Sequence, residues 1–279
     1  MADELPPETE GDEVEALEIR LLIEAIRARY GYDLSGYAPK SLRRRVLVAL
    51  RRSGCEHLGE LQHLLLHDAG FFAEVLASLT VRVSEMFREP EQYRVLRERV
   101  LPILGTYPLL RFWHAGCAGG EEAYASAIML SEVGLYERAQ IYATDLSLEA
   151  LEQAKQGIYR AESLQRFADN YALGGGSGDF DAYYTAAYGG LAMKPWLARN
   201  ILFLQHDLVS DHVFGEMQVV FCRNVLIYFG DELRRRVIAK LVQSLAPGGF
   251  LCLGVSERLP REAGGEVVPF AAPGIYRHS

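Results

Sequence analysis

Two adjacent glutamates, Glu121 and Glu122, follow a run of small residues in the stretch HAGCAGGEEAYASAIML, residues 114–130. Small residues between a strand and a helix are typical of a turn whose backbone lies against a ligand. A phosphate favours bare N–H groups at the positive end of a helix, and two carboxylates there would repel it. The turn also lacks the G-x-G-x-x-G and G-K-[ST] patterns. A nucleoside with positive charge and no phosphate, such as S-adenosylmethionine, suits these acids, although acids in a first helical turn also simply stabilise the helix.

From about residue 110 onward, short apolar strands alternate with helical segments, and this alternation predicts a parallel, doubly wound sheet. In such a sheet the ligand lies over the carboxyl ends of the strands. Each acid at a strand end can also be read as a helix cap, and Asp145 could cap a helix that begins near Leu148. The polar or loop residues predicted at these ends are Ala115, Gly116, Cys117, Asp145, Leu146, Asp207, Leu208, Arg223, Asn224 and Val225.

Composition excludes several classes of protein. The 279 residues carry a formal net charge of −8, which argues against general nucleic-acid binding. The chain has neither an apolar run of bilayer-spanning length nor the pattern of a signal peptide. Its four cysteines lack pair spacing, so we expect free thiols in a reducing cytoplasm. No metal site is predicted, and we expect a monomer.

The N-terminal third is predicted to be helical. Residues 1–15 form an acidic, Pro-containing stretch that we expect to be a disordered lead-in. We expect residues 16–77 to form a helical domain, residues 78–90 a linker, and residues 91–279 the domain with the sheet.

Residues 40–52, KSLRRRVLVALRR, contain six cations and no acid. This segment is either a solvated helix face or a docking stripe for an acidic partner, and its cations include Arg44, Arg45, Arg51 and Arg52.

Five segments in series give the chain a family resemblance. In order they are FREP, HAGCAGGEEAYASAI, IYATDLSLEALEQAKQGIY, HDLV and FCRNVLIYF, and they follow an all-helical region. Together they closely resemble the CheR-type chemotaxis receptor methyltransferases. The resemblance implies methyl transfer from S-adenosylmethionine, with S-adenosylhomocysteine as product, to glutamates on the cytoplasmic helical bundle of chemoreceptors. It also implies an antiparallel β-subdomain inserted at about residues 158–200.

The resemblance also assigns roles to individual residues. It implies that Asp145 holds the ribose, that Asp207 accepts from the adenine amine, and that Glu122 contacts the methionine moiety. Arg88 is expected to orient the substrate, and Tyr228 to lie near the methyl group. The same resemblance places at the cofactor Arg82, Ser84, Arg88, Ala115, Gly116, Cys117, Leu146, Leu208, Arg223, Asn224 and Val225, and places Arg44, Arg45, Arg51 and Arg52 at the receptor.

The chain departs from the family pattern in two places. The segment TVRVSEMFR has Arg82 where the family has asparagine, and it has Ser84 for threonine and Met86 for phenylalanine. Arg82 would either lower cofactor affinity or grip a carboxylate. The loop GGGSGDFD, residues 174–181, is longer than in relatives that dock on a receptor's C-terminal pentapeptide, so we expect docking without that tail. The alternative functions are a non-catalytic adaptor of the same fold and a methyltransferase of a non-receptor protein.

Overall fold

The computed structural model describes residues 10–32, 34–35, 39–79, 84–187, 189–213, 215–259 and 266–279. The chain divides into two compact units, one comprising residues 1–81 with 227–233 and the other residues 82–226 with 234–279. Helix α1 begins at Glu10, so residues 10–15 are helical, and the expectation of a disordered lead-in is wrong for them. Arg82 and residues 1–9 lie outside the described residues. None of the described helices is long and apolar enough to span a bilayer.

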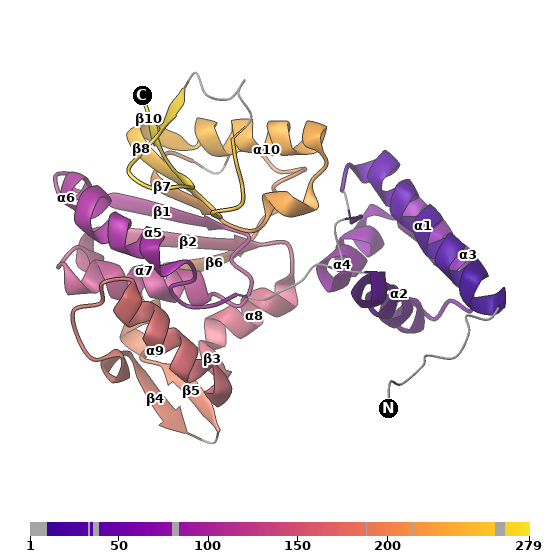
Figure 1. Cartoon of the computed structure of the whole chain (residues 1–279), viewed down its shortest axis with the longest axis horizontal. Helices are drawn as coiled ribbons and strands as arrows, with labels where there is room; N and C mark the ends of the chain where they lie inside the picture. Colours follow the sequence, from indigo (N-terminus) through magenta and orange to yellow (C-terminus); the bar gives the residue numbers. More distant parts are fainter. Residues whose placement is uncertain are drawn as a thin grey trace, which may run out of the picture. The chain divides into compact units, whose positions relative to one another are not determined.

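The described part of the first unit includes helices α1 to α4, which Figure 1 labels. Each buries one apolar stripe: in α2, Leu42, Val46 and Ala49 are at most 4% exposed, while the arginines occupy the other side. A strand-like contact joins Tyr32 to Phe229, whose rings meet edge to face with centroids 5.5 Å apart. Residues 227–233 therefore pack in this helical unit, although they lie far away in the sequence. The helices are α1 (Glu10–Tyr30), α2 (Pro39–Ser53), α3 (Leu58–His67) and α4 (Ala69–Leu79).

The second unit is built on a seven-stranded sheet in the order β6-β2-β1-β7-β8-β10-β9. The first five strands in that order are parallel, whereas β10 runs antiparallel to both of its neighbours. This arrangement confirms the predicted doubly wound sheet. The strands are β1 (Leu110–Ala115), β2 (Ala139–Asp145), β6 (Ile201–Gln205), β7 (Met217–Cys222), β8 (Leu245–Leu253), β9 (Val267–Pro269) and β10 (Ile275–His278).

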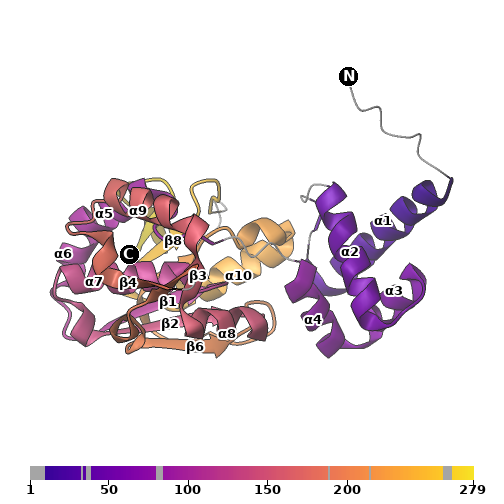
Figure 2. The same ribbon diagram turned by 90° about the horizontal axis from the view of Figure 1, so that it is seen from below.

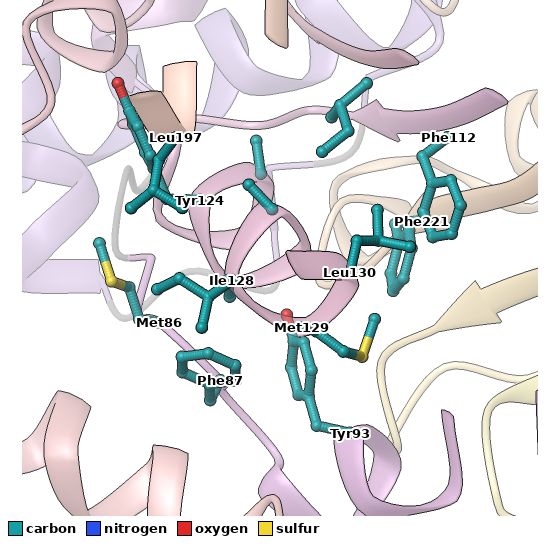
Figure 3. Packing of buried hydrophobic residues seen from close by; sticks show 14 of the residues in the cluster. Met86, Phe87, Tyr93, Phe112, Tyr124, Ile128, Met129, Leu130, Leu197 and Phe221 are labelled. Atoms are coloured by element: carbon teal, nitrogen blue, oxygen red, sulfur yellow. The ribbon is translucent and has the colours of Figure 1, made fainter. Parts of the chain in front are cut away.

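Helix α7 (Glu121–Glu132) forms the centre of the hydrophobic core of this unit. Its residues 123–130 are all buried, and Figure 3 shows Ile128 directed toward Phe87, and Leu130 toward Phe112 and Phe221. Because α7 is apolar nearly all around, it fits only between layers. Helix α8 (Leu148–Gln156) lies beside β2 and β6, as Figure 2 also shows. The remaining helices of the unit are α5 (Pro90–Val95), α6 (Leu101–Leu104), α9 (Leu164–Leu173) and α10 (Asp231–Gln243), with the π-helical turn η1 (Leu96–Val100) between α5 and α6.

Residues of the predicted linker belong to this core. Met86 and Phe87 are fully buried, and the Phe87 ring meets the rings of Tyr93 and Tyr171 edge to face. Pro90 occupies the first turn of α5, as its fixed φ predicts. The FREP segment thus packs inside the second unit and is not a spacer.

A small antiparallel sheet of three strands, in the order β3-β5-β4, lies at the lower edge of the unit in Figure 1. Hydrogen bonds to Glu132 anchor the Gly-rich loop 174–178 beside it. Glu132 at the end of α7 accepts hydrogen bonds from Tyr171, from Tyr183 at 3.1 Å, and from the Ser177 N–H at 3.3 Å, and it also pairs with Arg97. The strands are β3 (Ile158–Arg160), β4 (Tyr184–Ala187) and β5 (Gly190–Met193).

Two glycines with positive φ allow a direct test of this packing. Gly157 ends α8 at φ +60°, and a Cβ there would lie 2.6 Å from the Tyr124 hydroxyl, which donates to the Ala154 carbonyl at 3.1 Å. Gly134, at φ +70°, has nothing within 4 Å of such a Cβ. We expect G134A to lower the free energy of unfolding by about 1 kcal/mol through backbone strain alone, and G157A by at least about 2 kcal/mol. Urea unfolding of both variants measures the difference, and equal losses would contradict the crowding at Gly157.

Candidate active site

The carboxyl ends of four neighbouring parallel strands bring the predicted residues to one edge of the sheet. The Gly-rich turn follows β1, Asp145 ends β2, Asp207 follows β6, and the segment 223–225 follows β7. These strands stand side by side in the order β6-β2-β1-β7, so their ends line a single edge. This is the edge at which doubly wound sheets bind ligands.

The turn after β1 is held by backbone contacts. The N–H groups of Gly116 and Cys117 both donate to the Thr144 carbonyl at 2.8 Å, which ties the turn to the end of β2. Gly120 has φ +84° and precedes α7, and a Cβ on it would lie 2.8 Å from the Ala154 Cβ. Only glycine allows α8 to approach the turn this closely. Ala115 and Cys117 are each 3% exposed, and burial raises the pKa of the Cys117 thiol far above its usual value.

Asp145 couples β2 to this turn. Its Oδ2 accepts the Ala118 N–H at 2.8 Å, and its Oδ1 accepts the Ser147 N–H at 2.9 Å. Ser147, not Asp145, is the N-cap of α8, because its Oγ accepts the Ala150 N–H at 3.2 Å. A carboxylate offers about four acceptor sites, so a residue of this type can bind backbone N–H groups and a ligand hydroxyl together.

Asp207 organises the turn after β6. Its Oδ1 accepts the Val209 N–H at 2.8 Å and its Oδ2 the Ser210 hydroxyl at 2.9 Å. Leu208 beside it is 8% exposed, and the Leu146 carbonyl accepts from the Gln205 side chain at 3.1 Å. The contact to adenine that the resemblance implies for Asp207 stays a prediction.

A buried cluster of charges surrounds Arg223. Its Nη1 donates to Oε1 of Glu122 at 2.5 Å, and its Nη2 donates to Oε2 of Glu89 at 2.9 Å and to the Arg88 carbonyl. The other oxygen of Glu122 lies 3.1 Å from Nδ1 of His114. Burial alone would raise the pKa of Glu122, but Arg223 and His114 together lower it to about 2. Glu122 therefore remains ionised, with both oxygens engaged inside the protein.

Glu121 differs from Glu122, because one of its carboxylate oxygens has no hydrogen-bond partner in the described part of the chain. That oxygen, Oε2, is buried. Burial raises the pKa of Glu121, because an ionised carboxylate is costly there without a counterion. A cation at this point would remove that cost. The sequence interpretation named both acids and assigned the methionine moiety to Glu122, and that assignment stays a prediction.

The segment after β7 packs onto the Gly-rich turn. Asn224 has φ +60°, which is uncommon for a residue other than glycine. A Cβ on Gly116 would lie 2.5 Å from Cγ2 of Val225, so Val225 covers the turn directly. Sequence reasoning did not predict that Glu89 pairs with Arg223, although Glu89 stands in the FREP segment, because the motif does not show what its acid contacts. It also did not predict that Glu257 accepts the Asn224 N–H at 2.8 Å, because Glu257 stands in none of the five segments.

The other predicted residues belong to the first unit or lie outside the described chain. Tyr228 ends the 3₁₀ turn η6 (Leu226–Tyr228), in the segment that packs with the helical unit. On α2, Arg44, Arg51 and Arg52 are exposed, but Arg45 is half-buried with an inaccessible Nε, so it contributes less to the surface than we expected. Arg82 cannot be placed, because it lies outside the described residues.

Comparisons with known proteins agree with this geometry. Residues 82–269 match the family model described as CheR methyltransferase, SAM binding domain, and residues 17–80 match its all-alpha domain. The chain is 48% identical over 241 residues to the Pseudomonas putida protein Cher3, with 86% of this chain and 88% of that protein covered. It is 34% identical to chemotaxis protein methyltransferase 1 of Pseudomonas aeruginosa, with 75% and 78% covered, and 30% identical to the chemotaxis protein methyltransferase of Listeria monocytogenes, with 84% and 87% covered.

The strand ends have the chemistry that S-adenosylmethionine requires. Gly116 and Gly120 leave the backbone of the turn bare, since a Cβ on either would clash with a neighbour. Asp145 is a carboxylate at the end of β2, a group that suits hydroxyl donors, and the buried Oε2 of Glu121, which has no partner among the described residues, suits a cation. The cofactor supplies a sulfonium-bound methyl group, and these residues would hold the nucleoside and its positive charge.

The pKa of Glu122 predicts how its contribution to stability changes with pH. Because its folded-state pKa of about 2 lies below its ordinary value of 4.5, ionised Glu122 stabilises the fold above pH 4.5. This contribution, up to about 3 kcal/mol at about 1.4 kcal/mol per pKa unit, is lost as the pH falls from 4.5 toward 2. We expect the difference in unfolding free energy between the unmodified protein and E122Q to shrink over that range.

Urea unfolding at a series of pH values measures this difference. The exposed carboxylate of Glu98 provides the control, since E98Q should differ little from the unmodified protein at any pH. A difference for E122Q that does not change with pH would contradict the ionised, paired state of Glu122.

Proposed function

Since this chain belongs to the CheR family of S-adenosylmethionine-dependent methyltransferases, we propose that it methylates glutamate side chains on the cytoplasmic helical bundle of a chemoreceptor. The observation that carries the proposal is the acidic Gly-rich turn, in which a buried Glu121 oxygen has no hydrogen-bond partner among the described residues and Gly116 and Gly120 leave no room for a Cβ. Such a turn disfavours phosphate and favours a cationic nucleoside. The names of the relatives support a role in chemotaxis, and we propose a cytoplasmic location for the same reason.

The proposed reaction makes few demands on acid–base chemistry. A glutamate has an unperturbed pKa of about 4.3, so at neutral pH the acceptor is already a carboxylate nucleophile and needs no general base. One carboxylate oxygen forms a bond to the methyl carbon while the bond from sulfur to that carbon breaks, and no proton is transferred. Opposite charges cancel as the bond forms, so a dry, well-oriented site accelerates the step. We propose that Arg88 and Tyr228 orient the acceptor, and that Asp145, Glu121 and the segment 223–225 hold the cofactor.

The proposed docking surface is the exposed basic stripe on α2, defined by Arg44, Arg51 and Arg52. Acidic helical bundles would meet this stripe by long-range attraction, which governs association rate and orientation. We propose that this contact recruits the receptor without its C-terminal pentapeptide.

Transfer of labelled methyl from S-adenosylmethionine to a receptor cytoplasmic fragment tests the reaction. We expect base-labile label that is released as methanol, and we expect D145N to reduce its transfer about ten- to a hundredfold, because one backbone N–H would lose its charged acceptor. E152Q, an exposed acid on α8 beyond the site, is the matched control and should retain full transfer. Absence of label with retained cofactor binding would refute the proposed acceptor, and base-stable label would refute the carboxyl chemistry.

Reversal of charge on α2 tests the docking stripe. The double variant R44E/R51E should bind a receptor fragment without its C-terminal tail at least about tenfold more weakly at low salt, and binding of the unmodified protein should weaken as salt is added. The matched control is R99E/R111E, which reverses two exposed arginines of the second unit. Surface plasmon resonance measures both, and equal binding by the two double variants would refute the stripe.

A further inference from the structure

Glu257 is a buried carboxylate that no motif in the sequence indicates. It is 6% exposed and lies in the loop after β8. Its Oε2 accepts the N–H groups of Asn224 and Gly254, each at 2.8 Å, and its Oε1 accepts the Leu226 N–H at 2.9 Å. One side chain thus holds backbone from the loops that follow two neighbouring strands, β7 and β8.

The segment that Glu257 holds is strained and tightly packed. Asn224 has φ +60°, a conformation that costs a non-glycine residue energy unless the surroundings impose it. A Cβ on Gly254 would lie 2.9 Å from both the Asn224 Nδ2 and the Glu257 Oε2, so no space remains at this junction. The carboxylate satisfies the N–H groups on either side of Val225, and it thereby supplies the constraint that the strained backbone needs.

Val225 transmits this constraint to the Gly-rich turn. Its Cγ2 would stand 2.5 Å from a Cβ on Gly116, so the Val225 side chain lies directly against the Gly116 backbone. Gly116 in turn donates to Thr144 at the end of β2, next to Asp145. A displacement of the segment 224–226 would therefore alter the shape of the turn at which the cofactor binds.

We propose that Glu257 is a positioning residue of the cofactor site, one that sets the affinity for S-adenosylmethionine by holding the segment 224–226 against the Gly-rich turn. This role requires that the chain binds its cofactor, and it does not depend on which carboxylate accepts the methyl group. It can therefore be tested without any receptor.

The E257Q variant removes the charge and keeps the size of the side chain. A glutamine has one oxygen that accepts, so its amide NH2 must face at least one of the three N–H groups. An N–H left without an acceptor in a buried loop is costly, and we expect the dissociation constant for S-adenosylhomocysteine, measured by isothermal titration calorimetry, to rise about tenfold.

E132Q provides the matched control. Glu132 has a side chain that is 5% exposed, and it accepts hydrogen bonds from Tyr171 and Tyr183, but it lies at the last residue of α7. By the rise of the helix, it stands about 16 Å from the Gly-rich turn. We expect E132Q to lower the melting temperature without changing the dissociation constant.

The two variants separate positioning from stability. Weaker binding by E257Q together with unchanged binding by E132Q supports the proposal, whereas unchanged binding by E257Q overturns it. Equal weakening in both variants also overturns it, since the effect would then follow general destabilisation. If E257Q does not fold, G254A crowds the same junction and keeps the charge of Glu257, and unchanged affinity in G254A would overturn the proposal.

Discussion

Arg223 is a buried cation around which three stretches of chain, far apart in sequence, close together. Its guanidinium pairs with Glu122 at the start of α7 and with Glu89 before α5, donates to the Arg88 carbonyl, and stands 5.5 Å from the centre of the Tyr93 ring. Burying a guanidinium costs several kcal/mol unless it is paired, so these partners cannot move independently of it. The FREP segment, the first turn of α7 and the end of β7 are consequently fixed by one interaction.

The acids around the site serve two different purposes. Asp145 and Glu257 accept backbone N–H groups from loops that lack regular partners, and Glu122 neutralises Arg223. These carboxylates stabilise the fold, because a buried N–H group or cation without a partner would lower the free energy of unfolding. Glu121 differs, since one of its oxygens is buried and has no partner in the described part of the chain.

Local patterns predicted much of this architecture. Helix α8 begins at Leu148, as predicted, because Ser147 caps its start. The Gly-rich turn and the acids at the strand ends were also predicted, since parallel strands place their ends on one edge. Other features depend on contacts between distant residues. Burial of Met86 and Phe87, which appeared to belong to a linker, depends on α7 and on Tyr171.

The sequence by itself determined the doubly wound sheet and the family, because periodicity and motifs are local properties of the chain. Only the tertiary structure decided that Glu121, and not Glu122, has a carboxylate oxygen without a hydrogen-bond partner among the described residues. It alone revealed that Glu257 holds the segment after β7. It also decided that residues 227–233 pack with the N-terminal helices. The contacts concerned are those of Arg223 with Glu122, of Asn224 with Glu257, and of Tyr32 with Phe229. Each joins residues more than 30 positions apart, and local sequence patterns do not indicate contacts over such separations.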